Sequence, residues 1–395
     1  QLVFYGIPWL EWGQRQAVLF DLGARRFYIF GLVLYPQDFI YLTGILVISA
    51  LSLFLFTAVA GRLWCGYACP QTVYTEMFLW IEKKVEGDRS ARMRRDAQPL
   101  SLDKFTRKSA KHLLWLMVAL WTGFTFVGYF TPIKDLATEF VQMQMSSWEV
   151  FWTFFYGFAT YGNAGFMREQ VCKHMCPYAR FQSAMFDKDT LIVTYDEARG
   201  EPRGARSRKA DPAVLNLGAC IDCTLCVQVC PTGIDIRKGV QYECIGCGAC
   251  ADVCDTVMDK MGYAKRLVKY STENAINQHW TKSQTIRHVL RPRILIYSAI
   301  LAAIVVAMLI SLSLRTPFKV DVVRDRGVMA RIVSGGKVEN VYRLQLMNAT
   351  ESAQRYKITA SGLPGLSVSS ENVVTVGSTE SRWVAVRVQA PFDAA

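Results

Sequence analysis

Histidine is scarce in this sequence, with four residues in 395. His112, His279 and His288 show no spacing typical of metal ligands, and no residue pair suggests axial ligands for a haem. The sequence also lacks a Ser/His/Asp grouping, a phosphate-binding loop and a dinucleotide fingerprint. These absences argue against the corresponding hydrolase, nucleotide-binding and haem chemistries, and leave the twelve cysteines as the candidates for a reactive site.

Acidic residues are the second shortage: 33 Asp and Glu stand against 45 Lys and Arg, which gives a net charge of +12. At the same time 51% of the residues are hydrophobic. This combination favours a membrane protein with basic cytoplasmic loops. Nucleic-acid binding is the competing use of positive charge, but the basic residues cluster beside long apolar runs. We therefore expect membrane lipid as a partner, and no nucleic acid.

Four apolar runs are each long enough to cross a bilayer as a helix. A buried helix of a soluble protein would explain one such run, but not four. A shorter apolar stretch, 70–82, predicts a helix lying at the cytoplasmic membrane interface. The four predicted spans are residues 39–60, 112–133, 148–167 and 294–314.

Basic residues predict the orientation of these spans. Residues 83–111 hold ten Lys and Arg, whereas residues 134–147 hold one. The positive-inside rule places the first loop in the cytoplasm and the second in the periplasm. The chain after span 148–167 would then be cytoplasmic, and the chain after Arg315 periplasmic. Residues 1–38 would lie outside, and their apolar start predicts one further N-terminal helix in the intact protein. We expect the protein to lie in a bacterial inner membrane.

Eight cysteines form two copies of C-x2-C-x2-C-x3-C, the run typical of bacterial ferredoxins. Structural zinc is the alternative, but zinc sites usually use two separated pairs of ligands. Thiolates that hold iron must stay reduced, which agrees with a cytoplasmic location. In two-cluster ferredoxins the fourth cysteine of each run binds the other cluster. The pattern thus predicts two [4Fe–4S] clusters, one held by Cys220, Cys223, Cys226 and Cys254, the other by Cys244, Cys247, Cys250 and Cys230.

The other four cysteines form two C-x3-C-P motifs, each after the predicted cytoplasmic end of a span. Cysteines four apart share a face of a helix. The proline, however, suits the first position of a new helix, with the second cysteine as its N-cap and its thiol pKa lowered. Two such pairs could present four thiolates to one metal. The cysteines concerned are Cys65, Cys69, Cys172 and Cys176.

Four buried structural thiols are the alternative interpretation of these motifs, since free cysteine packs well. Duplication of the spacing at one membrane face favours a metal or redox site instead. Soft thiolates select Cu(I), zinc or an iron–sulfur cluster, and the sequence leaves these open together with a transient disulfide. His174 and Met175 lie inside the second motif and could add ligands.

The chain therefore reads as a multi-domain membrane protein. Short alternating segments after Thr316, separated by Gly, Asn and Ser, predict a small antiparallel β-sandwich without Cys or His, suited to an interaction role. The basic linker could contact anionic lipid or simply be solvated. We expect a transmembrane bundle with both C-x3-C-P motifs (1–193), the basic linker (194–212), a 2[4Fe–4S] ferredoxin domain (213–265), a connector with the last transmembrane helix (266–315), and a periplasmic sandwich (316–395).

Residues 61–72 (GRLWCGYACPQT), residues 194–204 (TYDEARGEPRG) and the paired ferredoxin runs resemble the CcoG/FixG/RdxA family of membrane polyferredoxins, accessory to cbb-type cytochrome c oxidases. The resemblance covers nearly the whole chain and implies an immunoglobulin-like C-terminal domain. It also implies a cupric reductase that converts Cu(II) to Cu(I) for oxidase assembly, with copper-handling and cbb-type oxidase assembly proteins as partners. Asp255 departs from the proline that often follows the fourth cysteine of a run.

The resemblance implies that the copper or redox site is formed by Cys65, Cys69, Cys172 and Cys176. Two alternatives remain. The first is an electron-transfer subunit similar to the quinol-oxidising polyferredoxins of periplasmic nitrate reduction. The second is a copper-holding assembly chaperone whose clusters are structural. The sequence does not separate a quinol from a cytoplasmic reductant as the electron donor.

Overall fold

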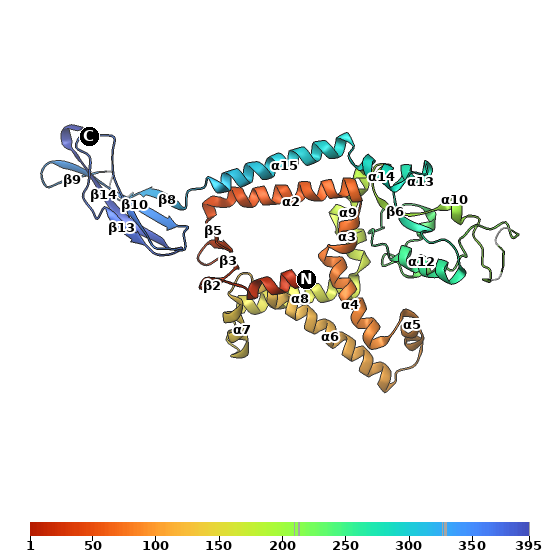
Figure 1. Ribbon diagram of the computed structural model, residues 1–395. Helices are drawn as coiled ribbons and strands as arrows, with labels where there is room; N and C mark the ends of the chain where they lie inside the picture. Colours follow the sequence, from red (N-terminus) through yellow and green to blue (C-terminus); the bar gives the residue numbers. More distant parts are fainter. Residues whose placement is uncertain (209, 212–213, 326, 328–329, 395) are drawn as a thin grey trace. The chain divides into compact units, whose positions relative to one another are not determined.

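The computed structural model describes residues 1–208, 210–211, 214–325, 327 and 330–394. The chain forms two compact units (Figure 1). Unit 1 contains Gln1–Leu42, Val127–Met145 and Met308–Ala395, and unit 2 contains Thr43–Phe126 and Ser146–Ala307. The segments predicted to be periplasmic, 1–38, most of 134–147 and 316–395, all belong to unit 1. Segments of the same predicted side thus fold together, although the sides themselves stay a prediction.

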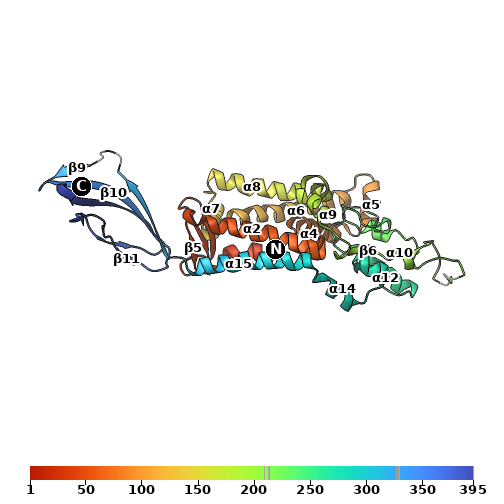
Figure 2. The ribbon, with the colours of Figure 1, turned by 90° about the horizontal axis from the view of Figure 1, so that it is seen from above.

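Three helices in the described part of the chain are long and apolar enough to cross a membrane: α2 (Phe39–Ala60), α6 (Leu102–Val127) and α15 (Pro292–Ser313). α2 and α15 run side by side (Figures 1 and 2), and Arg291 Nη2 donates to Ala58 O at 2.7 Å. The predicted spans 39–60 and 294–314 are confirmed as helices. The bounds 112–133 are wrong, because a turn before α7 (Ile133–Val141) ends the helix at Val127, and Pro132 disfavours helix at the residue before it.

The fourth predicted span, 148–167, is not one long α-helix. α8 (Ser147–Gly162) has 16 residues, and the chain continues as a π-helical segment, η3 (Asn163–Met167). A Ser146–Glu149 capping box starts α8. Glycines let it approach its neighbours closely, since a Cβ on Gly123 of α6 would lie 2.1 Å from Thr153 O. This segment is therefore shaped by contact with α6 rather than by span length alone.

The predicted helix at 70–82 is confirmed and extends further, as α4 (Pro70–Glu86). Short helices α3 (Leu63–Tyr67) and α5 (Arg89–Ala97) precede and follow it. The expected position on the membrane surface is not tested. Instead, α4 buries one face in unit 2, where Phe78 stacks on Trp115 of α6 with ring centroids 5.0 Å apart.

The cysteine-rich module lies in unit 2 and is larger than residues 213–265. Strands β6 (Ile192–Tyr195) and β7 (Val268–Ser271) pair antiparallel at its border, and Tyr195 is buried in its core. Gly204 N donates to Cys220 O at 3.3 Å. The stretch 194–212 therefore begins as part of the module and not as a free linker, while residues 209, 212 and 213 lie outside the described residues. The module's helices are α10 (Glu197–Gly200), α11 (Leu225–Gln228) and α12 (Ala249–Met261).

Helices that flank this module complete unit 2. They are π-helical η4 (Val171–Met175), α9 (Pro177–Met185), α13 (Glu273–Asn277) and α14 (Lys282–Val289).

Unit 1 is built mainly of strands. Its C-terminal part has a sheet in the order β12-β14-β10-β8, with β9 on β10, and a separate β11-β13 pair. Val374 and Val376 of the pair share a buried core with Leu344 and Val386 of the larger sheet, as a sandwich requires. The predicted small antiparallel sandwich is confirmed, and its strands are β8 (Phe318–Arg324), β9 (Arg331–Val333), β10 (Lys337–Asn348), β11 (Gln354–Lys357), β12 (Ser367–Val368), β13 (Val373–Val376) and β14 (Ser381–Pro391).

Strands near the N-terminus were not expected from the sequence. β3 (Val18–Asp21), β4 (Arg26–Ile29) and β5 (Leu32–Leu34) form a small sheet. Leu19 and Tyr28 of this sheet share a buried cluster with Met347 of β10. Residues 1–38 thus fold onto the C-terminal domain. The shorter elements are α1 (Leu2–Gly6), η1 (Ile7–Trp9), β1 (Glu11–Trp12), β2 (Arg15–Gln16), η2 (Pro36–Asp38), η5 (Ile236–Lys238) and η6 (Phe392–Ala394).

Candidate redox site

Four cysteines from both ferredoxin runs line one cavity of unit 2. Cys220, Cys223, Cys226 and Cys254 form its walls together with apolar side chains such as Val257, Met258 and Leu267. We call these four cysteines the first set. Cys254 is the last cysteine of the second run, on α12, so the fold brings it across to the three leading cysteines of the first run.

A second cavity has the reciprocal composition. Cys230, the last cysteine of the first run, lines it with Cys244, Cys247 and Cys250, and the buried residues Ile234 and Ile236 close it. We call these four cysteines the second set. Cys226 also reaches this wall. Two quartets of thiols in apolar cavities provide the donor set that [4Fe–4S] clusters use, so the residues present fit the expected cofactors.

The same backbone turn forms the loop of each run. Asp222 and Thr224 have φ of 53° and 56°, and the equivalent Gly246 and Gly248 have φ of 69° and 74°. These left-handed residues alternate with the cysteines and bend the chain around the cavity. The second loop uses glycine because other chain segments press on it. A Cβ on Gly248 would lie 2.5 Å from the Tyr270 hydroxyl.

Burial controls protonation of these thiols. It raises the pKa of Cys247 and Cys254 to about 11 and that of Cys250 to about 12. Thiols with such pKa values hold their protons at neutral pH, so metal binding must displace those protons.

The C-x3-C-P cysteines occupy two kinds of position. Cys69 and Cys176 are the N-caps of α4 and α9, each followed by proline in the first turn, as predicted. Cys65 lies in α3 and Cys172 in η4. Because one helix ends between the two cysteines of each motif and the next begins at the proline, the pair does not occupy one continuous helix face.

The four C-x3-C-P thiols share one neighbourhood in unit 2. Cys65 and Cys172 are each close enough to be affected by the charges of Cys69 and Cys176, and by each other. Cys65 Sγ donates to Oε1 of the buried Gln182 at 3.4 Å. Burial raises the pKa of Cys65, and that of Cys172 to about 11; these are the two cysteines that are not N-caps.

The arrangement of these four thiolates around a single ion stays a prediction. Among the described residues, no three His, Cys, Asp or Glu side chains group closely enough to hold one metal ion. His174 and Met175, considered as extra ligands, are exposed.

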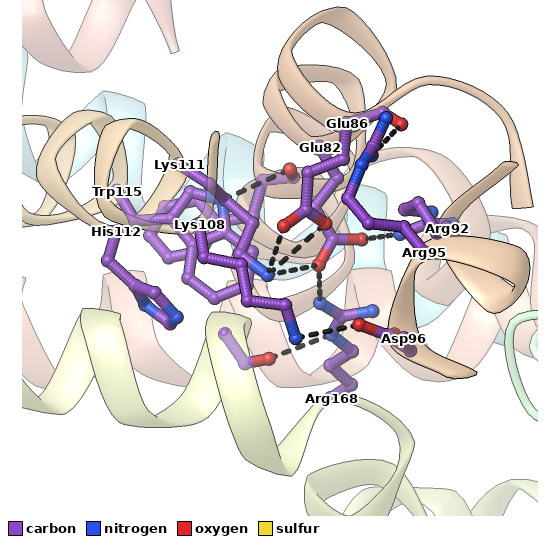
Figure 3. Close-up of polar contacts among 12 residues, drawn as sticks. Glu82, Glu86, Arg92, Arg95, Asp96, Lys108, Lys111, His112, Trp115 and Arg168 are labelled. Carbon is purple, nitrogen blue, oxygen red and sulfur yellow. Dashed lines mark hydrogen bonds and ion pairs between the residues drawn. The ribbon is translucent and has the colours of Figure 1, made fainter. Parts of the chain in front are cut away.

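Sequence reasoning missed a buried charge cluster beside these motifs (Figure 3). Glu82 and Glu86 of α4 are 4% and 5% exposed. Arg168 Nη2 lies 2.7 Å from Glu82 Oε1, Lys111 Nζ lies 3.3 Å from Glu86 Oε1, and Arg92 pairs with Glu82. The available signal was two glutamates four residues apart at the end of a helix whose middle is mostly apolar.

This cluster supports the chain that leads to Cys172. Arg168 joins η3 to η4 with a φ of 40°, a conformation that costs free energy in a residue with a side chain. Its guanidinium is fixed by Glu82, and its carbonyl accepts from Gln71 Nε2 at 3.2 Å. Gln71 follows Cys69 and Pro70 directly, so these contacts tie the two C-x3-C-P motifs together.

Family models cover all twelve cysteines. Residues 167–273 match a "4Fe-4S dicluster domain" and residues 42–86 a "4Fe-4S binding domain". Residues 308–395 match the "IG-like fold at C-terminal of FixG". A crystal structure of a FixG-related protein from Vibrio parahaemolyticus aligns with 20% of this chain and 72% of its own, at 27% identity and a TM-score of 0.19.

Three curated proteins are similar over most of their length. Nitrogen fixation protein FixG of Rhizobium meliloti is 38% identical over 92% of this chain and 75% of its own. Protein RdxB of Cereibacter sphaeroides is 40% identical over 96% and 82%, and Protein RdxA of the same organism 38% identical over 92% and 78%. The chain therefore belongs to the FixG/RdxA family and is a membrane iron–sulfur electron-transfer protein.

Proposed function

We propose that this protein is a cupric reductase that supplies Cu(I) for the assembly of cbb-type cytochrome c oxidase. The observation that supports this best is the proximity, within unit 2, of the second cysteine set to the C-x3-C-P thiols. Tyr67, two residues after Cys65, donates its hydroxyl to Cys247 O at 2.7 Å. Electron-carrying and copper-accepting sulfur ligands would thus be neighbours.

The first and second sets would each hold a [4Fe–4S] cluster, with Cys254 and Cys230 exchanged between the runs. A cluster bound there supplies one electron at a time, which matches the one-electron reduction of Cu(II) to Cu(I). In that step the reduced cluster would donate the electron and become oxidised. A quinol or a cytoplasmic reductant would then reduce the cluster again. The chain's own contribution is to hold the ligands, keep water from the apolar cavities and place the acceptor thiols nearby.

Copper enters this proposal as substrate. Cys65, Cys69, Cys172 and Cys176 would receive it, because thiolates prefer Cu(I) and their binding of the product favours reduction. Release of the thiol protons on copper binding is then required, given the raised pKa of Cys65 and Cys172.

We also propose the sidedness predicted by charge, with the cysteine module cytoplasmic and the C-terminal domain periplasmic. The ten basic residues of 83–111 support the first part. The gathering of 1–38 and 316–395 into unit 1 supports a shared side for those two segments. The C-terminal domain would then be placed to meet copper-handling or oxidase-assembly proteins in the periplasm.

The test is copper reduction by purified protein in detergent, chemically reduced and freed of reductant before Cu(II) is added. A Cu(I)-specific chelator reports the product. Cys172→Ser is expected to lower the rate at least about tenfold while both cluster signals in electron paramagnetic resonance remain. Gln170→Ala, at the exposed N-cap of η4, is the matched control. An unchanged rate in Cys172→Ser would exclude this thiol as the copper acceptor.

A third cluster is the second candidate for the four C-x3-C-P thiols. The match of residues 42–86 to a 4Fe–4S binding domain favours it, because that segment contains Cys65 and Cys69 but none of the eight ferredoxin cysteines. Three [4Fe–4S] clusters require about twelve irons per chain and two clusters about eight. Iron analysis of wild type and Cys172→Ser separates the candidates: only a third cluster predicts that the variant loses about four irons.

A further inference from the structure

One short turn of unit 2 rests directly on the second cysteine set. This α3 turn, residues 62–67, carries Cys65. A Cβ on Gly66 would lie 2.8 Å from Cys247 Cα, and a Cβ on Gly246 would lie 3.1 Å from the carbonyl carbon of Arg62. Glycine on both sides therefore lets the two backbones touch, and the hydroxyl of Tyr67 adds a hydrogen bond to Cys247 O.

The first set differs in its surroundings. Its loop has Asp222 and Thr224 where the second loop has glycines, so side chains are tolerated there. Cys223 of the first set is exposed although Cys220 and Cys226 are buried, whereas all four cysteines of the second set are partly buried. The second set is therefore covered by the α3 turn, and the first set reaches the surface at Cys223.

Arg62 lies at the centre of the enclosed contact. Arg62 is buried, with 5% of its surface exposed. The guanidinium donates to Tyr242 O, to Cys244 O at 3.3 Å and to Ala179 O. One carbonyl belongs to a ligand of the second set, and another lies three residues after Cys176. Arg62 thereby joins the loop of the second set to the start of α9.

The charge of Arg62 needs compensation. Burying a cation without a negative neighbour is costly. Four ionisable thiols lie close enough to Arg62 to interact with its charge: Cys65, Cys244, Cys172 and Cys176. Metal-bound thiolates would provide the negative charge, so the buried guanidinium fits a site whose cysteines are ligated.

We propose that Arg62 is a positioning residue that couples the second cysteine set to the C-x3-C-P thiols. Its three carbonyl contacts hold the α3 turn against the second loop, and its positive charge raises the reduction potential at the second set. The proposal rests on the proposed cluster ligation, but not on copper being the substrate. It assigns the second set as the side that faces the acceptor, and the first set as the side open to a soluble reductant.

The chain provides a matched arginine at the first set. Arg206 Nη1 donates to Cys220 O at 3.3 Å, and Nη2 donates to Gly218 O at 2.6 Å. Its Nε donates to the Tyr263 hydroxyl at 3.0 Å. Arg206 thus donates to the backbone carbonyl of a first-set cysteine, as Arg62 does to that of a second-set cysteine. Among the described residues, however, Arg206 makes no bridge to the C-x3-C-P motifs.

The test is a redox titration of the full chain followed by electron paramagnetic resonance. Arg62→Gln is expected to lower the reduction potential of the second-set cluster by about 59 mV. This shift corresponds to a change of about tenfold in the one-electron equilibrium constant. The first-set potential should stay unchanged. Arg206→Gln should show the reverse pattern. A shift of the first set in Arg62→Gln, or of neither set, would overturn the proposal.

Two further variants keep the test decisive if Arg62→Gln assembles poorly. Arg62→Lys cannot reach three carbonyls but keeps the positive charge. Because the charge is kept, the one-electron equilibrium constant for reduction of the second-set cluster should stay within about threefold of the wild-type value. Gly66→Ala should instead separate the two backbones and slow electron transfer from the second set to the acceptor at least about tenfold. Gly162→Ala, where a Cβ meets nothing within 4 Å, is its control. Equal rates in the two glycine variants would contradict the coupling role.

These readouts separate the inference from the proposed function. If copper is not the substrate, Cys172→Ser leaves copper reduction unchanged while the potential shifts of Arg62→Gln and Arg206→Gln persist. If Arg62 has no coupling role, the shifts disappear while copper reduction still depends on Cys172.

Discussion

The two units of this protein divide the chemistry completely. All twelve cysteines and all four histidines of the sequence fall within unit 2, and the ranges of unit 1 contain neither residue type. Unit 1 instead consists mainly of short strands with an immunoglobulin-like C-terminal part. A unit without soft metal ligands is suited to contacts with other proteins, and a unit with twelve thiols is suited to electron transfer.

One structural device is nevertheless common to both units. In unit 2, the carboxylates of Glu82 and Glu86 are buried among basic side chains. In unit 1, Asp38 is 2% exposed and lies 2.6 Å from Arg315 Nη2 and 2.8 Å from Lys319 Nζ. Asp38 immediately precedes α2, and Arg315 follows α15 by two residues. Buried ion pairs occur in both units, so they do not by themselves indicate redox function.

Loss of a cluster ligand should have the largest effect, confined to unit 2. Cys254→Ser is expected to remove about four irons and the same resonance signal as Cys220→Ser, because both line the first cavity. Cys230→Ser and Cys247→Ser should remove the other signal together. Thr256→Ser, an exposed neighbour on α12, should lose nothing. Grouping of Cys254 with Cys247 instead would contradict the exchange of ligands between runs.

Glu82→Ala should destabilise unit 2 next most strongly. It leaves Arg92, Arg168 and Lys111 without their shared carboxylate, and removal of one partner from a buried ion pair costs about 3–5 kcal/mol. Thermal unfolding in detergent measures the loss. Lys188→Ala, which breaks an exposed pair with Glu273, is the control and should cost less than about 1 kcal/mol. Equal effects of the two substitutions would show that the Glu82 cluster is not structural.

The eight ferredoxin cysteines were predictable because their geometry is local. Three of each four ligands lie within seven residues, and the left-handed turns at Asp222, Thr224, Gly246 and Gly248 are built into that spacing. The C-x3-C-P cysteines were recognisable as a repeated motif, and their N-cap role followed from proline. Their neighbourhood was not predictable, since it depends on Arg62, Gln182 and Gln71, whose partners are distant in sequence.

The predicted helix bounds agree with the structure where the length of an apolar run determines the helix. They differ where contacts with other parts of the chain determine it. The bounds of α2 match the apolar run 39–60. In contrast, α6 begins at Leu102 within the basic stretch, because Lys111 has a buried carboxylate to pair with. The N-terminal strands were missed because each has four residues or fewer and their core partner, Met347, is more than 300 residues away.

Asp38→Asn provides the unit 1 counterpart to the Glu82 substitution, with a smaller expected effect. Asparagine keeps the shape and some hydrogen bonds of the side chain but removes the charge that pairs with Arg315 and Lys319. Lys319 is partly solvated, so we expect a loss of about 1–3 kcal/mol. Unfolding monitored by near-ultraviolet circular dichroism measures it. Both cluster potentials should remain at their wild-type values, and a shift in either would contradict the separation of chemistry between the units.

Tyr35→Phe should have the smallest effect and tests how the N-terminal segment is attached within unit 1. The buried Tyr35 hydroxyl donates to Asn348 O at 2.9 Å, which links η2's N-cap to the end of β10. Removing one such hydrogen bond costs about 0.5–1.5 kcal/mol. Tyr342→Phe on β10, whose hydroxyl makes no hydrogen bond with the described residues, is the control and should be nearly neutral. Faster proteolysis of residues 1–38 in Tyr35→Phe alone would show that this contact fastens the segment to the C-terminal domain, while equal proteolysis in both variants would leave the buried Leu19, Tyr28 and Met347 cluster as the main attachment.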